Sequence, residues 1–170
     1  MAYKGKYKPK NPDKYIGDVK DIVYRSLWER SAFKWLDTTS SIVRWNSEDC
    51  IIPYICGTDN RPHKYYMDLW FQTDEGKTYI VEIKPKAQTE KPKKPQRQTR
   101  RYVTESLTWV KNQSKWKAAE EYAADRGWHF EIWTEDTLRG LGIRITDTKP
   151  SRKTTRRGNN NKTRASNKKP

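Results

Sequence analysis

The strand expected at residues 78–84 constrains this chain more than any other segment, because it carries charge inside an apolar run. The run is apolar until Glu82 and Lys84 appear two positions apart, and the period of a strand places both side chains on one face. The preceding apolar run, residues 66–71, also holds a single acid, Asp68. Acids are rare in such surroundings unless they have a partner, so the two carboxylates indicate a function.

A hairpin is the simplest connection between these two runs, and its register decides whether the acids meet. If Asp68 pairs with Glu82, the loop centres on Glu75 and needs an odd length or a bulge, for which Gly76 is suited. A register shifted by one residue would send the acids to opposite faces. We predict the register that pairs Asp68 with Glu82.

Two neighbouring carboxylates need a proton or a cation between them. At a separation of about 4 Å they repel by about 4 kcal/mol at an effective dielectric constant of roughly 20. Oxygen ligands without nearby His or Cys fit Mg²⁺, with Mn²⁺ as a substitute. Such an ion would activate a water and offset the charge of a phosphodiester, while Lys84 would position that water. The sequence therefore predicts a metal held by Asp68 and Glu82.

The remaining periodicity predicts an α/β fold with a mixed β-sheet flanked by helices. Ser26 opens a Ser-x-x-Glu capping box, which starts a helix with apolar residues at helical spacing. Short β-branched and aromatic runs predict strands. The expected order is αββββααβα: a helix at 27–37, strands at 42–45, 50–55, 65–71 and 78–84, helices at 97–111 and 114–127, a strand at 128–133 and a short helix after Thr134.

The formal charge of +15 divides into an acidic body and three basic segments. Residues 149–170 hold nine basic residues and no acid, which is typical of a disordered basic tail. Residues 84–101 predict a basic loop entering a helix, and residues 1–20 an extended basic N-terminal arm. The rest of the predicted domain, residues 21–148, carries a net charge of −5 outside the loop. This division indicates a polyanionic partner, most often nucleic acid.

Several classes of protein are disfavoured by the same sequence. It has no apolar run of about 18 residues and no apolar N-terminal stretch, so neither membrane spanning nor secretion is expected. Cys50 and Cys56 are too far apart for a Cys-x-x-Cys pair, and only His63 and His129 could join them. We therefore expect buried thiols rather than a zinc site or a disulfide framework.

The spacing of Asp68 and Glu82-Ile83-Lys84 resembles the PD-(D/E)xK nuclease motif, with Met67 in place of the proline. Glu29 on the first helix is similar to the extra acid that such nucleases often carry. Further segments extend the resemblance, over nearly all of residues 1–145, to the head completion nucleases of T-even-like tailed bacteriophages, which look similar to transposon end-cleaving nucleases. These segments are YRSLWE at 24–29, PY at 53–54, MD at 67–68, VEIKPK at 81–86, WKAA at 116–119 and TED at 134–136.

The resemblance implies a restriction-endonuclease-like fold and a metal-dependent DNA nuclease that prepares a filled phage head for tail joining. It implies double-stranded DNA and portal, neck or head–tail connector proteins as partners. It also implies a place in the host cytoplasm during assembly and then in the head–neck region of the virion. The catalytic residues would be Glu29, Asp68, Glu82 and Lys84, of which the three acids would hold metal.

Alternatives remain open beside this interpretation. Glu29 also suits the capping box, and an isolated Glu-x-Lys is more often a solvated ion pair. A catalytically silent adaptor that binds DNA and capsid or neck proteins is the second functional hypothesis. The basic tail could hold DNA or an acidic capsid protein. Because the basic loop starts at Lys84, we expect its other cations to contact DNA phosphates: Lys86, Lys91, Lys93, Lys94, Arg97, Arg100 and Arg101.

Overall fold

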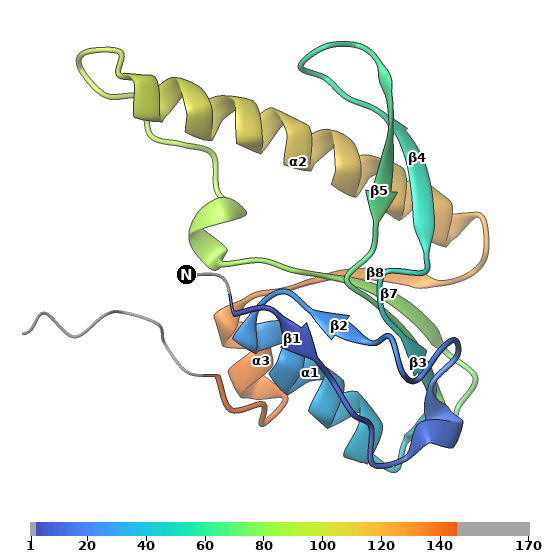
Figure 1. Cartoon of the computed structure of the whole chain (residues 1–170). Helices are drawn as coiled ribbons and strands as arrows, with labels where there is room; N and C mark the ends of the chain where they lie inside the picture. Colours follow the sequence, from blue (N-terminus) through green and yellow to red (C-terminus); the bar gives the residue numbers. More distant parts are fainter. Residues whose placement is uncertain (1–2, 146–170) are drawn as a thin grey trace, which may run out of the picture.

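The computed structural model describes residues 3–145, which are built around one central four-stranded sheet (Figure 1). Neighbouring strands are antiparallel except for the last pair, which is parallel, so the sheet is mixed as predicted. The strand order is β3 (Ile42–Asn46), β6 (Leu69–Thr73), β7 (Thr78–Ile83) and β8 (His129–Trp133).

Helices cover both faces of this sheet, and the alternation of side chains along β7 divides the core between them. Val81 and Ile83 pack in one core, which also contains residues of α1 (Leu27–Thr38) and α3 (Glu135–Gly140). Ile80 points the other way, into a second core formed with α2 (Arg100–Ala124). The predicted arrangement of helices around a mixed sheet is therefore confirmed. Within residues 3–145, no helix is both long enough and apolar enough to span a membrane.

The predicted single strand at residues 65–71 is wrong, because the chain changes sheets in the middle of it. β5 (Pro62–Tyr66) pairs with β4 (Ile51–Ile55) in a separate two-stranded hairpin, whereas β6 starts only at Leu69 in the central sheet. The order thus has five strands, not four, between α1 and α2. Asp68 lies at the crossing, where its carboxylate, rather than a backbone carbonyl, accepts the N–H of Ile83 at 2.7 Å.

The two helices predicted at 97–111 and 114–127 are one continuous helix, α2. Ser114 does not cap a helix as expected. Its hydroxyl donates to the Val110 carbonyl at 3.0 Å and accepts from the Gly57 N–H at 3.0 Å. A serine that bonds back to its own helix leaves the helix unbroken. Here it also attaches the tip of the β4–β5 hairpin to α2.

The N-terminal segment, predicted as an extended basic arm, is attached to the domain. β1 (Gly5–Lys6) pairs with β2 (Val23–Tyr24), and a 3₁₀ turn follows at Pro12–Lys14. The fully buried Asp37 carboxylate accepts from the Tyr7 hydroxyl at 3.0 Å and from two backbone N–H groups of this segment. The predicted basic tail at 149–170 lies outside the described residues.

Replacing Asp37 with Ala should destabilise the fold by about 3 kcal/mol. Hydrogen bonds to a charged group are each worth about 1.5–3 kcal/mol, and the two backbone donors, on exposed Lys10 and Asn11, can bond to water instead. Urea unfolding measures this change, with Asp13→Ala on the exposed 3₁₀ turn as the control. If the two variants unfold at the same urea concentration, the attachment through Asp37 contributes nothing.

Candidate active site

The register of β6 and β7 is the one predicted from the sequence. Leu69 lies opposite Val81, and one step further along the same register brings Asp68 opposite Glu82. Gly76 closes the connecting loop with φ +78°, a left-handed conformation that favours glycine, and donates to the Thr73 carbonyl at 2.9 Å. The two acids are thus brought together where β6 begins and β7 ends, at one end of the two inner strands of the central sheet.

The residue before Asp68 has its own structural reason. Met67 is buried, and its backbone N–H donates to the Cys50 carbonyl at 3.0 Å. Its carbonyl accepts from the Glu48 N–H at 3.1 Å. Proline, which the nuclease motif usually has here, could not make the first of these bonds. The departure from the motif therefore allows a backbone hydrogen bond that holds the base of the hairpin.

Glu82 and Lys84 form a partly buried ion pair on the central strand β7. The Glu82 side chain is only 3% exposed, and its Oε1 lies 2.8 Å from the Lys84 Nζ. For Lys84, burial lowers the pKa, but the charge of Glu82 and the hydrogen bond to it outweigh burial, so the pKa is raised. Lys84 is therefore a stable cation that faces two carboxylates.

The Asp68 carboxyl has a pKa raised well above its usual value of 3.8. Burial is the main cause, and the negative charge of Glu82 adds to it, while the hydrogen bond from the Ile83 N–H acts in the opposite direction. One ammonium thus balances only one of the two acids. The arrangement can take either a proton on Asp68 or a further cation.

Tyr65 adds a polar atom that suits a hydrated cation. Its side chain is 1% exposed, and its hydroxyl has no hydrogen-bond partner among residues 3–145. The hydroxyl lies near Glu82 without hydrogen-bond geometry to it, and burial and the charge of Glu82 raise its pKa. A buried polar atom without a partner is costly, and an ordered water on a bound metal would supply the partner. The donor set of Asp68, Glu82 and Tyr65 therefore fits a hydrated divalent ion.

Glu29 lies in the first turn of α1 and serves the helix cap. Its carboxylate accepts from the Arg25 N–H at 2.7 Å and from the Ser26 hydroxyl at 2.9 Å, and burial raises its pKa. Glu29 also lines, with Ile83 and Lys84, a groove of about 360 Å³. The capping role is thus observed, and the same position places Glu29 in one groove with Lys84, where its charge also acts on Asp68.

Two side chains close to this site were not predicted from the sequence. Glu48 pairs with Arg25, whose Nη2 donates to Oε2 at 3.0 Å, and no pattern in the sequence pointed to Glu48. Lys115 lies with its Nζ 4.7 Å from the centroid of the Tyr65 ring, and its pKa is lowered, mainly by burial. The charges of Glu82 and Asp68 act on it in the opposite direction. The predicted helix at 114–127 contained Lys115, but its place beside Tyr65 depends on how α2 packs against the hairpin.

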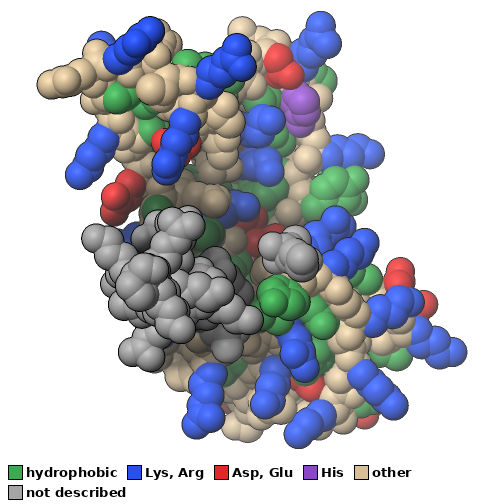
Figure 2. Space-filling model, turned by 60° about the vertical axis from the view of Figure 1, so that its left-hand side comes forward, with side chains coloured by type: hydrophobic (Ala, Val, Ile, Leu, Met, Phe, Trp, Pro, Cys, Tyr) green, Lys and Arg blue, Asp and Glu red, His purple; other side chains and the backbone are tan. Residues whose placement is uncertain are grey.

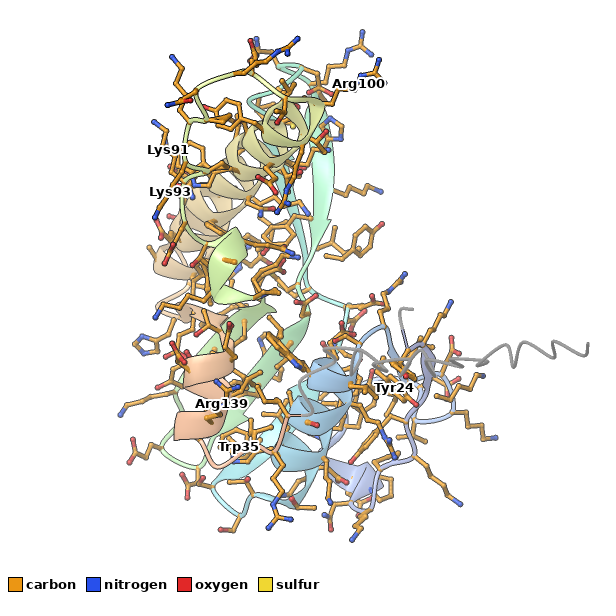
Figure 3. All side chains as sticks on the ribbon, turned by 90° about the vertical axis from the view of Figure 1, so that its left-hand side faces the viewer. Tyr24, Trp35, Lys91, Lys93, Arg100 and Arg139 are labelled. Carbon is orange, nitrogen blue, oxygen red and sulfur yellow. The ribbon has the colours of Figure 1, made fainter. Side chains whose placement is uncertain are left out.

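The basic side chains of the loop at residues 84–101 differ in whether they contact other parts of the protein. Lys86 is bound to α3, because its N–H donates to Glu135 at 2.8 Å and its Nζ to Asp136 at 3.0 Å. Arg101 pairs with Glu105 at 2.7 Å, and Lys91 lies over the Trp109 ring. Lys93, Lys94, Arg97 and Arg100 are exposed. In Figure 3, Lys91 and Lys93 project from the edge of the upper part opposite the β4–β5 hairpin.

At the tip of the β4–β5 hairpin, Cys56 lies close to two other residues of types that bind metals. The ligand atoms of Cys56, Asp59 and His63 are within 4.8 Å of one another. The pattern Cys-x₂-Asp-x₃-His was the signal that the sequence analysis did not use. Each group already has a protein partner: His63 Nε2 lies 2.9 Å from Asp59, and Cys56 Sγ lies 3.0 Å from the Thr58 hydroxyl. This cluster is separate from the carboxylates on β7.

Comparisons with known proteins agree with the geometry of the site. A family model described as TnsA-like endonuclease N terminal matches residues 39–135, a range that contains Asp68, Glu82 and Lys84. Glu29 lies before this range. The chain is also 46% identical over 148 residues to a protein of Enterobacteria phage T4 named head completion nuclease. That match covers 85% of this chain and 99% of the phage T4 protein.

Proposed function

Since the chain belongs to the TnsA-like endonucleases and, among them, to the head completion nucleases, we propose that it hydrolyses phosphodiester bonds of double-stranded DNA with Mg²⁺. Mn²⁺ would substitute for Mg²⁺, and the domain would have a PD-(D/E)xK core. The observation that carries this proposal is the half-buried Asp68, directly before β6, opposite the buried Glu82 of β7, with Lys84 as the cation 2.8 Å from Glu82.

Each residue would have a distinct role in this reaction. A divalent cation held by Asp68 and Glu82 would supply Lewis-acid activation of water and neutralise charge at the phosphate. Lys84 would orient the attacking water or a phosphate oxygen from its place beside Glu82. Glu29 would assist from the adjoining groove once its carboxylate leaves the cap. Lys93, Lys94, Arg97 and Arg100 would hold the duplex through its phosphates, without reading its sequence.

The name of the phage T4 relative suggests where this activity would be used. We propose that the protein acts on packaged DNA, so that a filled head becomes ready to join a tail. It would assemble with portal, neck or head–tail connector proteins in the host cytoplasm and stay at the head–neck region of the virion. The uneven distribution of charge supports a DNA partner, because basic segments precede, interrupt and follow a body of net charge −5 along the sequence.

Supercoiled plasmid tests the proposal. With Mg²⁺ the wild type should nick or linearise the plasmid, whereas EDTA or the substitution Glu82→Gln should leave it supercoiled. Glu75→Gln is the matched control, because Glu75 is exposed and pairs only with Lys77 in the β6–β7 loop. If wild type and Glu82→Gln both bind the plasmid and both leave it intact, the adaptor function replaces the nuclease.

A further inference from the structure

The β4–β5 hairpin has an apolar outer face that the described part of the chain leaves exposed. Residues directly opposite each other in the register share a face. The inner residues, such as Ile52 and Tyr65, are 1% exposed and pack against α2. On the outer face, Ile51, Ile55 and Tyr66 are 42%, 61% and 50% exposed. This outer face consists of the pairs Ile51–Tyr66, Pro53–Lys64 and Ile55–Pro62.

This outer face adjoins the candidate active site through the chain itself. Tyr66 is the last residue of β5 and precedes Asp68 by two positions. Two residues span at most about 7 Å of extended chain, so the outer face begins within that distance of the Asp68 backbone. Tyr66 and its cross-strand neighbour Ile51 are therefore within reach of a duplex whose reacting phosphate lies at Asp68 and Glu82.

Positive charge surrounds the outer face without dominating it. Lys64 lies in its centre, Arg61 in the loop at its tip, and Lys111 and Lys115 on the helix behind it. Figure 2 shows Lys and Arg side chains around the recess between the upper and lower parts of the molecule. A mostly apolar strip within a positive field matches a surface that offers apolar contacts between two anionic rims. The major groove of a DNA duplex offers thymine methyl groups between its two phosphate backbones, beside the donors and acceptors of the base edges.

We propose that the outer face of the β4–β5 hairpin enters a groove of duplex DNA beside the reacting phosphate. This inference rests on the proposed nuclease function and names the part of the duplex that is held. The major groove of B-DNA, roughly 12 Å wide, admits a two-stranded β-ribbon. Tyr66 and Ile51 contact sugars and base edges nearest the site, and Lys64 reaches a phosphate at the rim. The basic loop holds phosphates elsewhere on the same duplex.

The two kinds of contact respond differently to salt. A lysine on a phosphate releases counterions, so each one lost lowers the salt slope of binding by about 0.9. An apolar side chain in a groove releases no counterions. Its loss therefore weakens binding equally at every salt concentration. Binding measured across a series of salt concentrations thus separates the hairpin from the basic loop.

The test uses the double variant Ile51→Ser/Tyr66→Ala, made in the Glu82→Gln background so that cleavage does not interfere. Its affinity for a fluorescent DNA duplex is measured by anisotropy. We expect binding about tenfold weaker than in the Glu82→Gln parent at every salt concentration, with an unchanged slope. A single strand of the same sequence should lose less than threefold. Val43→Ser, an equally exposed apolar position on β3, is the matched control and should change neither quantity.

Affinity for the duplex within twofold of the parent overturns the proposal, as does an equal loss on single-stranded DNA. Unfolding temperatures equal to that of the parent confirm that the substitutions leave the exposed hairpin folded. If the hairpin variant loses duplex binding in this way but the wild type never cleaves plasmid, the hairpin proposal stands and the nuclease function is rejected. If the wild type cleaves plasmid but the hairpin variant binds the duplex as tightly as its parent, only the hairpin proposal is rejected.

Discussion

Replacing Asp68 with Asn should abolish DNA cleavage and, at the same time, stabilise the metal-free protein. Cleavage should fall by at least about 10³-fold, because a catalytic metal contributes several kcal/mol and each 1.4 kcal/mol is about tenfold in rate. The metal-free protein should gain about 1 kcal/mol near neutral pH. The substitution removes a half-buried acid beside Glu82 and keeps an oxygen that can accept the Ile83 N–H.

The pH dependence of stability follows from the raised pKa of Asp68. Above the usual value of 3.8, the folded protein keeps a proton on Asp68 that the unfolded chain releases. The stability of the metal-free wild type should therefore fall as the pH rises from that value through the raised pKa. Mg²⁺ should restore stability most at neutral pH, because there it no longer competes with the proton.

Thermal unfolding of wild type and Asp68→Asn, in EDTA and in Mg²⁺ from pH 4 to pH 8, measures both effects. Asp74→Asn is the control, since Asp74 is exposed in the β6–β7 loop. The account of the site would be wrong if Asp68→Asn unfolded at a lower temperature than wild type in EDTA at neutral pH. It would also be wrong if Mg²⁺ stabilised the variant as much as the wild type.

The substitution Lys84→Met should destabilise the protein as well as inactivate it. It removes the ammonium 2.8 Å from Glu82 and leaves that carboxylate 3% exposed with no cation in place. Breaking one side of a buried ion pair costs about 3–5 kcal/mol, although the 28% exposure of the Lys84 side chain places the expected loss at the low end. Cleavage should fall by about 10²–10⁴-fold if Lys84 positions the attacking water.

A double variant separates the two consequences of losing Lys84. Adding Glu82→Gln removes the stranded charge, so Lys84→Met/Glu82→Gln should recover most of the stability and none of the cleavage. Lys77→Met is the matched control, because Lys77 and Glu75 form an ion pair of 2.7 Å whose side chains are more than half exposed. Its free energy of unfolding should change by less than about 1 kcal/mol. Equal losses for Lys77→Met and Lys84→Met would show that burial of the Glu82 pair has no energetic consequence.

The sequence by itself determined the register of β6 and β7, the helix that Ser26 caps and the sheet with helices on both faces. These features depend on local rules: the period of two in a strand, the left-handed turn at Gly76 and the Ser-x-x-Glu cap. Because each rule acts within a few residues, the pairing of Asp68 with Glu82 could be predicted before any tertiary contact was known.

Only the tertiary structure decided what surrounds that pair. A run such as residues 65–71 has the same pattern whether it is one strand or two, and its break at Asp68 depends on the Ile83 N–H of another strand. Ser114 could cap a helix or bond within one, and Gly57, far away in sequence, supplies the partner that is observed. The nearness of Tyr65 and Lys115 to the acids depends likewise on how α2 packs against the hairpin. Long-range packing selects among local alternatives of similar energy, and a sequence pattern does not contain that selection.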